Sequence, residues 1–219
     1  MHQISDNKRK RAPSRRSLET HARIMDAAEV VFAARGFEGA SIRDIADAAN
    51  TQKALVSFHG GSKEELFVKI VSRRAQELAQ LRLTALDALA PNPSLRAIID
   101  CFIRPLLQKS TAEPGWQAYA RLIAHVSADQ RWQHITQTCF DPTAKRFINA
   151  IAALHPDADP QAIAACFVFT VSAMLSLCTS QWRVSALGDA PALDQEARIN
   201  QLIAFCVAGM HCVLDDDRP

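Results

Sequence analysis

Glycine and tyrosine are scarce in this sequence, which has seven glycines and one tyrosine in 219 residues. No run alternates polar and apolar residues for long enough to predict a β-sheet. Alanine and leucine are abundant, and both favour helices. These observations predict an all-α protein. The length suits one or two domains, and a hydrophobic share of 48% is enough for a substantial core.

Signatures of catalysis and of metal binding are also missing. The sequence has no glycine-rich phosphate loop, no paired-carboxylate motif and no nucleophile with a base at a recognisable spacing. None of the six cysteines forms a Cys-x-x-Cys pair, and no group of His and Cys has zinc-site spacing. We therefore expect no enzyme, no cofactor and no metal site. The cysteines are interpreted as reduced core residues, with a redox-sensing pair as the alternative.

Long apolar runs are absent as well. The basic N-terminus lacks the apolar segment of a signal peptide. The most apolar stretch, residues 162–178, has 17 residues and is interrupted by Thr170, Ser172 and Ser176. A bilayer-spanning helix needs about 20 apolar residues. The sequence therefore predicts a cytoplasmic protein with no membrane segment.

Residues 41–59 contain two short helical patterns separated by a break of a few residues. Ser41 precedes the first pattern and Asp44 follows three residues later, which is a capping-box signal with Asp in place of Glu. The second pattern, residues 52–59, directs apolar side chains inward and Gln, Lys and Ser outward. Two helices joined by so tight a turn are the shape that places a helix end in the major groove of DNA.

The flanking residues turn this pattern into a family resemblance. Upstream, residues 23–36 read RIMDAAEVVFAARG, and downstream Ser62 and Glu65 form a second capping signal. Over about 50 residues the sequence resembles the N-terminal domain of TetR-family transcriptional regulators. The rest of the chain is similar only in length and helical character, with a vague likeness to fatty-acid-responsive members. The matching residues are Ala27, Ala28, Phe32, Gly36, Ile45, Ala46, Ala49, Ala54, Leu55, Val56, Ser57, His59, Ser62, Lys63, Glu64, Leu66 and Phe67.

Four residues depart from the family pattern. Asn50 stands where Gly is usual, and Asn tolerates a left-handed backbone. Thr51 replaces a usual Val under the turn, and Phe58 replaces a usual Tyr. Gly60 replaces a Phe that packs the third helix against the domain, and loss of such a side chain typically costs roughly 3–5 kcal/mol. We expect Phe58 to turn inward as a partial substitute. An alternative function is therefore a ligand- or partner-binding dimer with weakened DNA binding.

The resemblance implies binding to a palindromic operator in double-stranded DNA, probed by the third helix. Gln52 can pair with adenine, Lys53 can reach guanine, and Ala54 can meet a thymine methyl. Taken singly, each of these residues could equally be a solvated surface residue. The remaining predicted contacts, several of them to phosphates, are Ser41, Arg43, Thr51, Ser57, Phe58, His59 and Lys63.

Basic residues are concentrated near the N-terminus. Residues 1–60 contain ten Lys and Arg against seven Asp and Glu, whereas residues 61–219 contain fifteen against sixteen. Such arms gain affinity for phosphates by counterion release, without reading base sequence. We expect residues 1–19 to form a disordered arm that either touches DNA or remains a solvated tail.

About nine helices are expected in all. A DNA-binding domain is predicted at residues 20–67 and an effector-binding and dimerisation domain at residues 68–219. Residues 113–115 read as a turn, and a single helix bent near Pro142 is expected at residues 129–155. The helix that begins after Ser62 is expected to end near residue 89. Four further helices are expected at residues 94–109, 116–127, 162–187 and 193–214.

The resemblance also implies a small-molecule effector that binds among the middle helices and moves two DNA-binding heads apart. The aromatic and soft side chains there suit a hydrophobic or amphipathic ligand, with a few polar groups to orient it. The alternative is that these residues are ordinary core. The predicted pocket residues are Phe102, Arg104, Trp116, Tyr119, Arg121, His125, Phe140, Phe167 and Met174.

The last two long helices carry the prediction of a homodimer. Residues 162–187 are apolar nearly all round, so one face can serve the core while another needs a second partner. Two such helices from each subunit could pair around a two-fold axis. The alternative is that both helices belong to the core of one subunit. The predicted interface residues are Phe167, Val171, Leu175, Trp182, Leu202, Ile203, Cys206 and Met210.

Overall fold

The computed structural model describes residues 14–188 and 194–215. Within these ranges the chain forms ten α-helices and one 3-10 helix, and no strand. The predicted all-α fold is confirmed, and the predicted count of about nine helices is close. The helices are α1 (Arg15–Gly39), α2 (Ile42–Ala48), α3 (Lys53–Gly60), α4 (Lys63–Asp87), α5 (Leu95–Ala112), α6 (Pro114–Ser127), η1 (Gln130–Trp132), α7 (Gln133–Cys139), α8 (Asp141–Leu154), α9 (Pro160–Gly188) and α10 (Gln195–Asp215).

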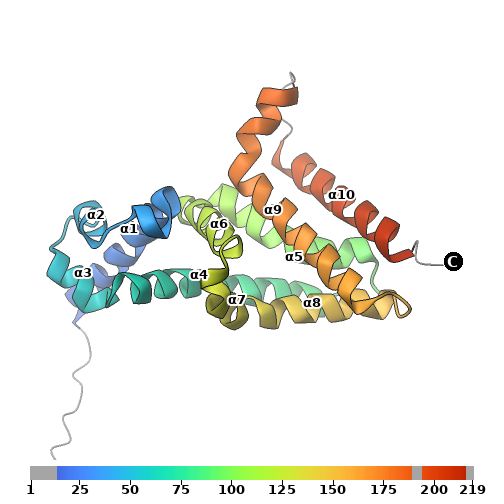
Figure 1. Cartoon of the computed structure of the whole chain (residues 1–219), viewed down its shortest axis with the longest axis horizontal. Helices are drawn as coiled ribbons and strands as arrows, with labels where there is room; N and C mark the ends of the chain where they lie inside the picture. Colours follow the sequence, from blue (N-terminus) through green and yellow to red (C-terminus); the bar gives the residue numbers. More distant parts are fainter. Residues whose placement is uncertain (1–13, 189–193, 216–219) are drawn as a thin grey trace, which may run out of the picture.

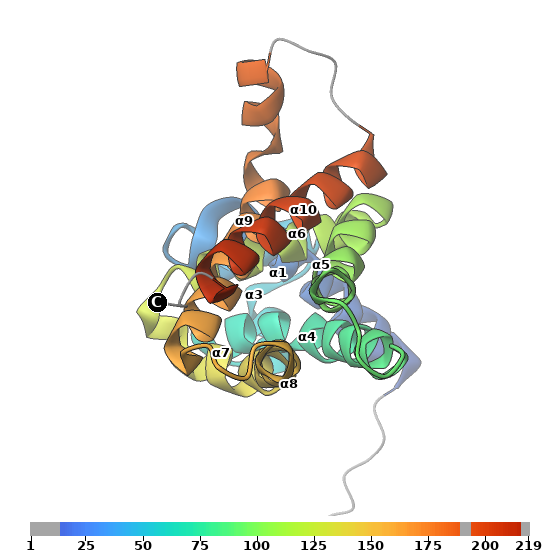
Figure 2. The same ribbon diagram turned by 90° about the vertical axis from the view of Figure 1, so that its right-hand side faces the viewer.

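The molecule is elongated, with α1, α2 and α3 at one end (Figure 1). The long helix α4 runs from that end into the rest of the molecule, which we call the body. The C-terminal end of α10 lies at the opposite end from α3. The last part of α9 projects from the body and stands apart from the start of α10, as the view along the long axis shows (Figure 2). Helix α4 is therefore a direct physical link between the two ends.

Two hydrophobic cores lie along this axis. The first core joins α1, α2, α3 and the start of α4, and the second core joins α5, α8, α9 and α10. Helix α6 contributes to both, because Leu122 and Val126 lie in the first core whereas Trp116 and Tyr119 lie in the second. Helix α6 therefore connects the two cores.

Three departures from the predicted helices have a clear physical reason. Helix α1 begins at Arg15, where Ser14 caps it, so the prediction of a disordered arm is wrong from Arg15 to residue 19; residues 1–13 lie outside the described ranges. Pro114 begins α6 instead of forming a turn. The helix expected at residues 129–155 is divided at Phe140 into η1 with α7, and α8. In both of the later cases proline occupies a first helical turn, where its missing N–H costs nothing.

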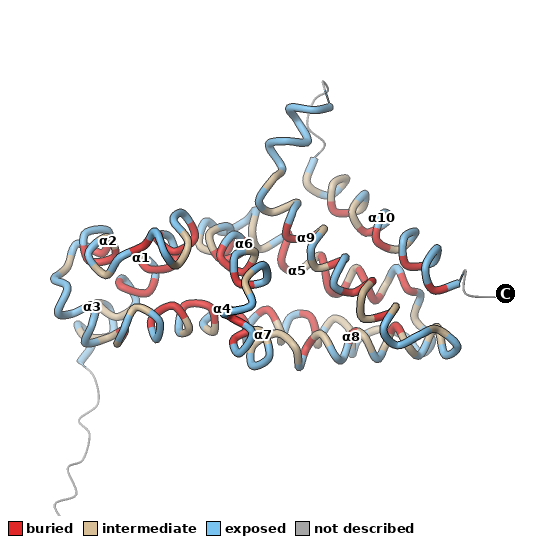
Figure 3. Tube along the Cα trace, in the orientation of Figure 1, coloured by how far each residue is buried: buried red, intermediate tan, exposed pale blue. Residues whose placement is uncertain are grey.

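Helix α9 changes character at Ser180, where the backbone leaves helical geometry (φ −123°, ψ 17°). Every residue from position 181 to position 188 is exposed. By length and composition alone, α9 and α10 are each apolar enough to cross a membrane, but a third of the most apolar window of α9 is buried within the body. The outer side of both helices is exposed in Figure 3.

Candidate nucleic-acid interface

Helix α2 is fixed at its start by the predicted capping box. The Ser41 hydroxyl accepts from the Asp44 backbone N–H at 3.1 Å, and the Asp44 carboxylate accepts from the Ser41 backbone N–H at 2.9 Å. Arg35 of α1 pairs with Asp44 at 2.8 Å. The Ser41 hydroxyl and the Arg35 charge hold the pKa of the Asp44 carboxyl below its ordinary value. Buried Ile45 and Ala46 attach α2 to the first core.

The turn between α2 and α3 has the left-handed residue that the sequence predicts. Asn50 has φ 46°, a conformation that Asn tolerates better than most residues. The Thr51 backbone N–H donates to the Ala46 carbonyl at 2.9 Å, which closes the turn. Gln52 is the N-cap of α3, and Val56 is the buried side chain that holds α3 on the core. These contacts fix the angle at which α3 meets solvent.

The outward face of α3 carries most of the predicted contact residues. Thr51 and His59 are half-buried, and Lys63 lies with its Nζ 4.4 Å from the centre of the Phe37 ring. Leu55 is 40% exposed on the same helix and was missed, because the helical pattern assigned the apolar residues of this helix to its inward face. The exposed predicted residues are Ser41, Arg43, Gln52, Lys53, Ala54, Ser57 and Phe58.

Phe58 does not replace the phenylalanine that the family usually has at position 60. Its side chain is 78% exposed, so the expectation that it turns inward is wrong. Leu66 of α4 occupies the space instead. A Cβ built on Gly60 would lie 3.0–3.2 Å from three carbons of the Leu66 side chain. The end of α3 is therefore packed against the first core by a different residue, and Gly60 is the residue that lets Leu66 approach.

Several basic groups missed by sequence reasoning gather at the end of α3. Lys69 donates to the Gly60 carbonyl at 2.9 Å, which neutralises the end of the helix. The rings of His21 and His59 meet edge to face with centroids 5.5 Å apart. Partial burial lowers the pKa of His21, and His59, Arg73 and Lys69 lower it further. Basic side chains therefore gather at this end of α3, and basic side chains attract phosphate.

Helices α1, α2 and α3, which we call the head, are anchored to α4 by charge pairs. Arg73 pairs with exposed Asp26 at 2.6 Å, and Arg74 pairs with Glu29 at 2.6 Å. Glu29 is 2% exposed; burial raises its pKa, and the hydrogen bond from Arg74 opposes that effect. The Arg74 guanidinium also lies 5.1 Å from the centre of the Trp116 ring of α6. Movement of α6 or α4 would therefore be transmitted to α1.

The predicted effector residues do not form one pocket. Five of them are buried in the second core: Phe102, Trp116, Tyr119, Phe167 and Met174. Phe140 is half-buried against the core, and Arg121 and His125 point into solvent from α6. Arg104 is held by Asp100 and Glu196. The helical pattern identified apolar residues correctly, but most of these residues pack inside the core and do not line a pocket.

A cleft of about 330 Å³ lies elsewhere, among α5, α6, α9 and α10. Its apolar walls include Leu107, Ala120 and Leu177. Polar side chains, Gln117 and Gln181 among them, share the lining. The volume is near the lower end of the range for small-molecule pockets. Sequence reasoning missed this cleft because its walls come from four helices whose contacts are not local.

Most of the predicted interface residues are not available on the surface of one chain. Five of its residues are buried in one chain's core, namely Phe167, Leu175, Ile203, Cys206 and Met210. Val171 and Leu202 are half-buried, and only Trp182 is exposed. Neighbouring helical positions differ by about 100°, so the exposed apolar face lies one or two residues along. That face, which we call the outer face, comprises Val168, Phe169, Phe205 and Val213.

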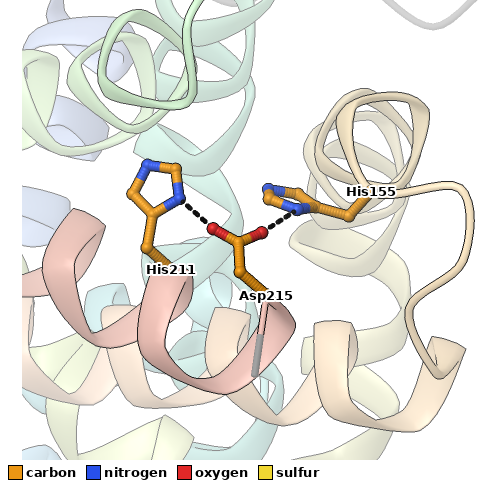
Figure 4. A group of neighbouring side chains, drawn as sticks. All are labelled: His155, His211 and Asp215. Carbon is orange, nitrogen blue, oxygen red and sulfur yellow. Dashed lines mark hydrogen bonds and ion pairs between the residues drawn. The ribbon is translucent and has the colours of Figure 1, made fainter. Parts of the chain in front are cut away.

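His155, His211 and Asp215 form a group at the end of the body far from α3 (Figure 4). Nδ1 of His211 lies 2.8 Å and Nδ1 of His155 lies 3.1 Å from the two Asp215 carboxylate oxygens. These contacts, that of His211 first, hold the pKa of Asp215 below its ordinary value. The group joins the end of α10 to the loop after α8. His155 is distant in sequence from His211 and Asp215, so residue spacing alone could not bring the three together.

Comparisons with known proteins agree with this geometry. Residues 24–70 match a family model described as bacterial regulatory proteins, tetR family. Residues 100–209, half of the chain, match a model described as tetracyclin repressor-like, C-terminal domain. No curated protein gives a match to the chain.

Solved structures with the same fold cover nearly the whole chain. A TetR-like transcriptional regulator from Rhodococcus sp. RHA1 is 20% identical with a TM-score of 0.61, covering 91% of this chain and 98% of that one. The hemolysin II regulator HlyIIR is 18% identical with a TM-score of 0.58, covering 86% and 97%. Salmonella enterica GusR is 18% identical with a TM-score of 0.56, covering 90% and 96%. At these identities the likeness shows the fold alone.

Proposed function

Because the chain belongs to the TetR family of bacterial regulatory proteins, we propose that it is a cytoplasmic repressor that binds a palindromic operator as a homodimer and is released by a small molecule. The observation that carries this proposal is the position of α3. It stands at the far end of the molecule with its polar face exposed, on a turn fixed by backbone hydrogen bonds. An exposed short helix on a rigid mount is what reading of the major groove requires.

The predicted contact residues on α3 and at its N-cap have roles that their chemistry supports. Lys53 is at the first helical position and can reach guanine O6 or N7. Gln52 can pair with adenine, and Ala54 is small enough to admit a thymine methyl. Ser57 and Phe58 extend the same face toward the sugar–phosphate backbone. Ser41 and Arg43, at the start of α2, supply phosphate contacts that fix the register.

The outer face supports the homodimer. Phe169 and Phe205 are 66% and 71% exposed, and Val168 and Val213 extend the apolar surface beside them. A groove of about 170 Å³ runs between α9 and α10 at this face, with Gly209 in its lining. Large apolar patches of this kind mark interfaces. Pairing of α9 and α10 with their two-fold copies would cover it and place two α3 helices on one duplex.

Effector release follows from the double role of α6. Gln117 and Ala120 of α6 line the cleft, whereas Leu122 and Val126 pack into the first core against the head. A ligand that favours a shifted α6 would therefore move α1 through the contacts of Arg74. Such a ligand shifts the equilibrium only by its differential affinity, about 1.4 kcal/mol per tenfold. The wider separation of the heads would no longer fit the operator.

Fluorescence anisotropy with the palindrome of the adjacent promoter tests this function. We expect binding that weakens steeply with salt, because phosphates are neutralised. Lys53→Ala should weaken specific binding by about 1–3 kcal/mol, roughly fivefold to a hundredfold. Lys145→Ala is the matched control, since Lys145 is exposed on α8 in the body.

Two results would count against a repressor. A shallow salt dependence would support the alternative of a ligand- or partner-binding dimer with weakened DNA binding. Equal losses in the Lys53 and Lys145 variants would show that α3 does not read the operator. Release is tested separately, by adding candidate effectors to the formed complex.

A further inference from the structure

His155, His211 and Asp215, which we call the terminal cluster, bring two imidazoles and a carboxylate together at the end of α10. One ring nitrogen from each histidine and one carboxylate oxygen all lie within 4.8 Å of one another. The three side chains converge on the same space, and the imidazole of His155 points toward His211 (Figure 4). Two imidazoles with one carboxylate are a donor set that suits zinc, whereas magnesium and calcium prefer oxygen ligands alone.

Helix α10 positions two members of the terminal cluster. His211 and Asp215 lie four residues apart, so their side chains share one face of the helix. The same spacing of two ligands on one helix occurs in the His-Glu-x-x-His zinc motif. Leu214, which is 6% exposed, holds this end of α10 in the second core. The two side chains are therefore arranged by the helix itself.

The third member comes from a loop whose backbone is fixed. His155 follows α8, and its backbone N–H donates to the Ala152 carbonyl at 3.1 Å. Its own carbonyl accepts from the Ala158 N–H at 3.2 Å. Only 9% of the His155 side chain is exposed. The loop therefore presents this imidazole on a rigid mount, as a preorganised binding site requires.

Nε2 of His155 is an unused donor atom in this arrangement. Among the residues that the structure describes, it is the one buried side-chain nitrogen or oxygen without a hydrogen-bond partner. Nδ1 of the same ring faces Asp215 at 3.1 Å. In a neutral imidazole with its proton on Nδ1, Nε2 carries a lone pair. Contacts within the terminal cluster leave this nitrogen unsatisfied, and a buried polar atom without a partner is costly.

We propose that the terminal cluster is a zinc site, in which one ring nitrogen from each histidine and an oxygen of Asp215 bind the ion and water completes a tetrahedron. Zinc–nitrogen bonds of about 2.0–2.1 Å place tetrahedral ligands roughly 3.3 Å apart. The contacts of Asp215 with the two histidines, at 2.8 Å and 3.1 Å, are close to that spacing. His211 and Asp215 are 51% and 55% exposed, which gives the ion an entry path and leaves room for the water.

A bound ion would fasten the end of α10 to the connection between α8 and α9. Metal sites that join distant segments stabilise the folded chain, because the unfolded chain does not hold the ligands together. Val213 lies between His211 and Asp215 in the sequence and belongs to the outer face. Zinc would therefore stabilise the body and fix one end of the surface that the proposed homodimer uses. The site itself does not depend on DNA binding or on the effector.

The competing interpretation is a clamp made only of contacts between the three side chains. A clamp needs no ion, and its loss would lower stability equally with and without zinc. A zinc site predicts that stability rises when zinc is added and that this rise requires the cluster. Measurements of binding and of melting temperature therefore separate the two interpretations.

The test uses full-length protein that has been treated with a chelator and then titrated with zinc in a calorimeter. We expect one zinc ion per chain at the terminal cluster. His155→Ala, His211→Ala and Asp215→Asn should each weaken binding by at least about tenfold. His125→Ala, which removes an exposed histidine of α6, is the matched control and should bind zinc as the unmodified protein does. Millimolar magnesium should not compete.

Thermal unfolding gives the second measurement. Zinc at about a hundred times its dissociation constant should raise the melting temperature by roughly 5–10 °C in the unmodified protein and in His125→Ala. It should leave His211→Ala unchanged. Because His155 is largely buried, folding of its variant is checked by circular dichroism, and the exposed His211 carries the test if that variant does not fold.

Cobalt(II) reports the ligands directly. Its visible absorption is strong in a tetrahedral site, and a thiolate ligand adds a charge-transfer band in the near ultraviolet. We expect the tetrahedral spectrum in the unmodified protein and the additional band in His211→Cys. The proposal is overturned if no stoichiometric zinc binds, if binding survives His211→Ala, or if His125→Ala weakens it equally. Since these measurements contain no DNA, their failure leaves the proposed function in place.

Discussion

The first core and the second core differ in how fully their charged groups are paired and in how much apolar surface they leave uncovered. Around the first core the carboxylates of Glu29 and Asp44 have partners. Glu29 pairs with Arg74, whereas Asp44 pairs with Arg35 and accepts a hydrogen bond from the backbone of Ser41. The second core retains a buried Arg82 that pairs with no carboxylate among the described residues, and it adjoins a cleft and the uncovered outer face. The first core pairs its buried carboxylate within one chain, which suits a helix that must present its base contacts in one geometry. The second core leaves surface for a ligand and for a second chain.

The largest expected effect comes from the outer face. Phe205→Asp places a charge in the middle of the proposed interface, and burial of an unpaired charge is costly. We expect dimers to dissociate, measured by light scattering after gel filtration. Operator affinity should fall by roughly a hundredfold to ten-thousandfold, because two linked half-site contacts become one.

The control for that variant is Asn149→Asp, which adds the same charge at an exposed position of α8. It should leave both the dimer and the operator affinity unchanged. Persistence of the dimer in Phe205→Asp would mean that the two subunits pair through another face.

Glu29→Ala tests the completeness of the first core. Removing one partner of a buried pair leaves Arg74 without its counter-ion beside Trp116, and we expect a loss of about 3 kcal/mol in the free energy of unfolding. Asp26→Ala, on the same helix, breaks the exposed pair with Arg73 and should cost less than about 1 kcal/mol. Urea unfolding measures both, and equal losses would show that burial of Glu29 has no special weight.

The same contrast explains which parts of the molecule could be predicted. Ser41 with Asp44, and Ser62 with Glu65, are capping boxes in the structure because a cap depends on residues three apart. The left-handed Asn50 is equally local. The choice of Phe205 over its neighbours for the outer face depends on distant helices, so periodicity alone could not make it.

Arg82 offered a signal that went unused. With Val71, Ala75 and Leu78 it continues a single apolar stripe of α4 at helical spacing, and all four are buried. An arginine in such a stripe is a candidate for a buried charge. The absence of a carboxylate partner, however, depends on how α5, α6 and α9 surround it, and only the structure contains that information.

Gly60→Phe tests how the first core closes the end of α3. The change restores the residue that the family usually has, yet we expect it to destabilise the protein by about 2 kcal/mol, because Leu66 already fills the space. Combining it with Leu66→Ala should recover part of the loss. Differential calorimetry on the single and double variants measures the coupling, and a single variant as stable as the parent would show that Leu66 moves aside easily.

The smallest effect concerns acid and the cap of α2. The Ser41 hydroxyl and the Arg35 charge lower the pKa of Asp44 in the folded chain, so this carboxylate stabilises the fold at any pH above its unfolded pKa of about 4. The contribution is lost as pH falls through the lower, folded pKa. Asp44→Asn should therefore flatten the decline of stability between about pH 4 and pH 2, seen in urea unfolding at several pH values. Asp47→Asn changes the same charge at an exposed position 3.9 Å from Arg43 and should leave that decline in place. If both variants gave the same profile, the capping box would not be the source of acid sensitivity in the first core.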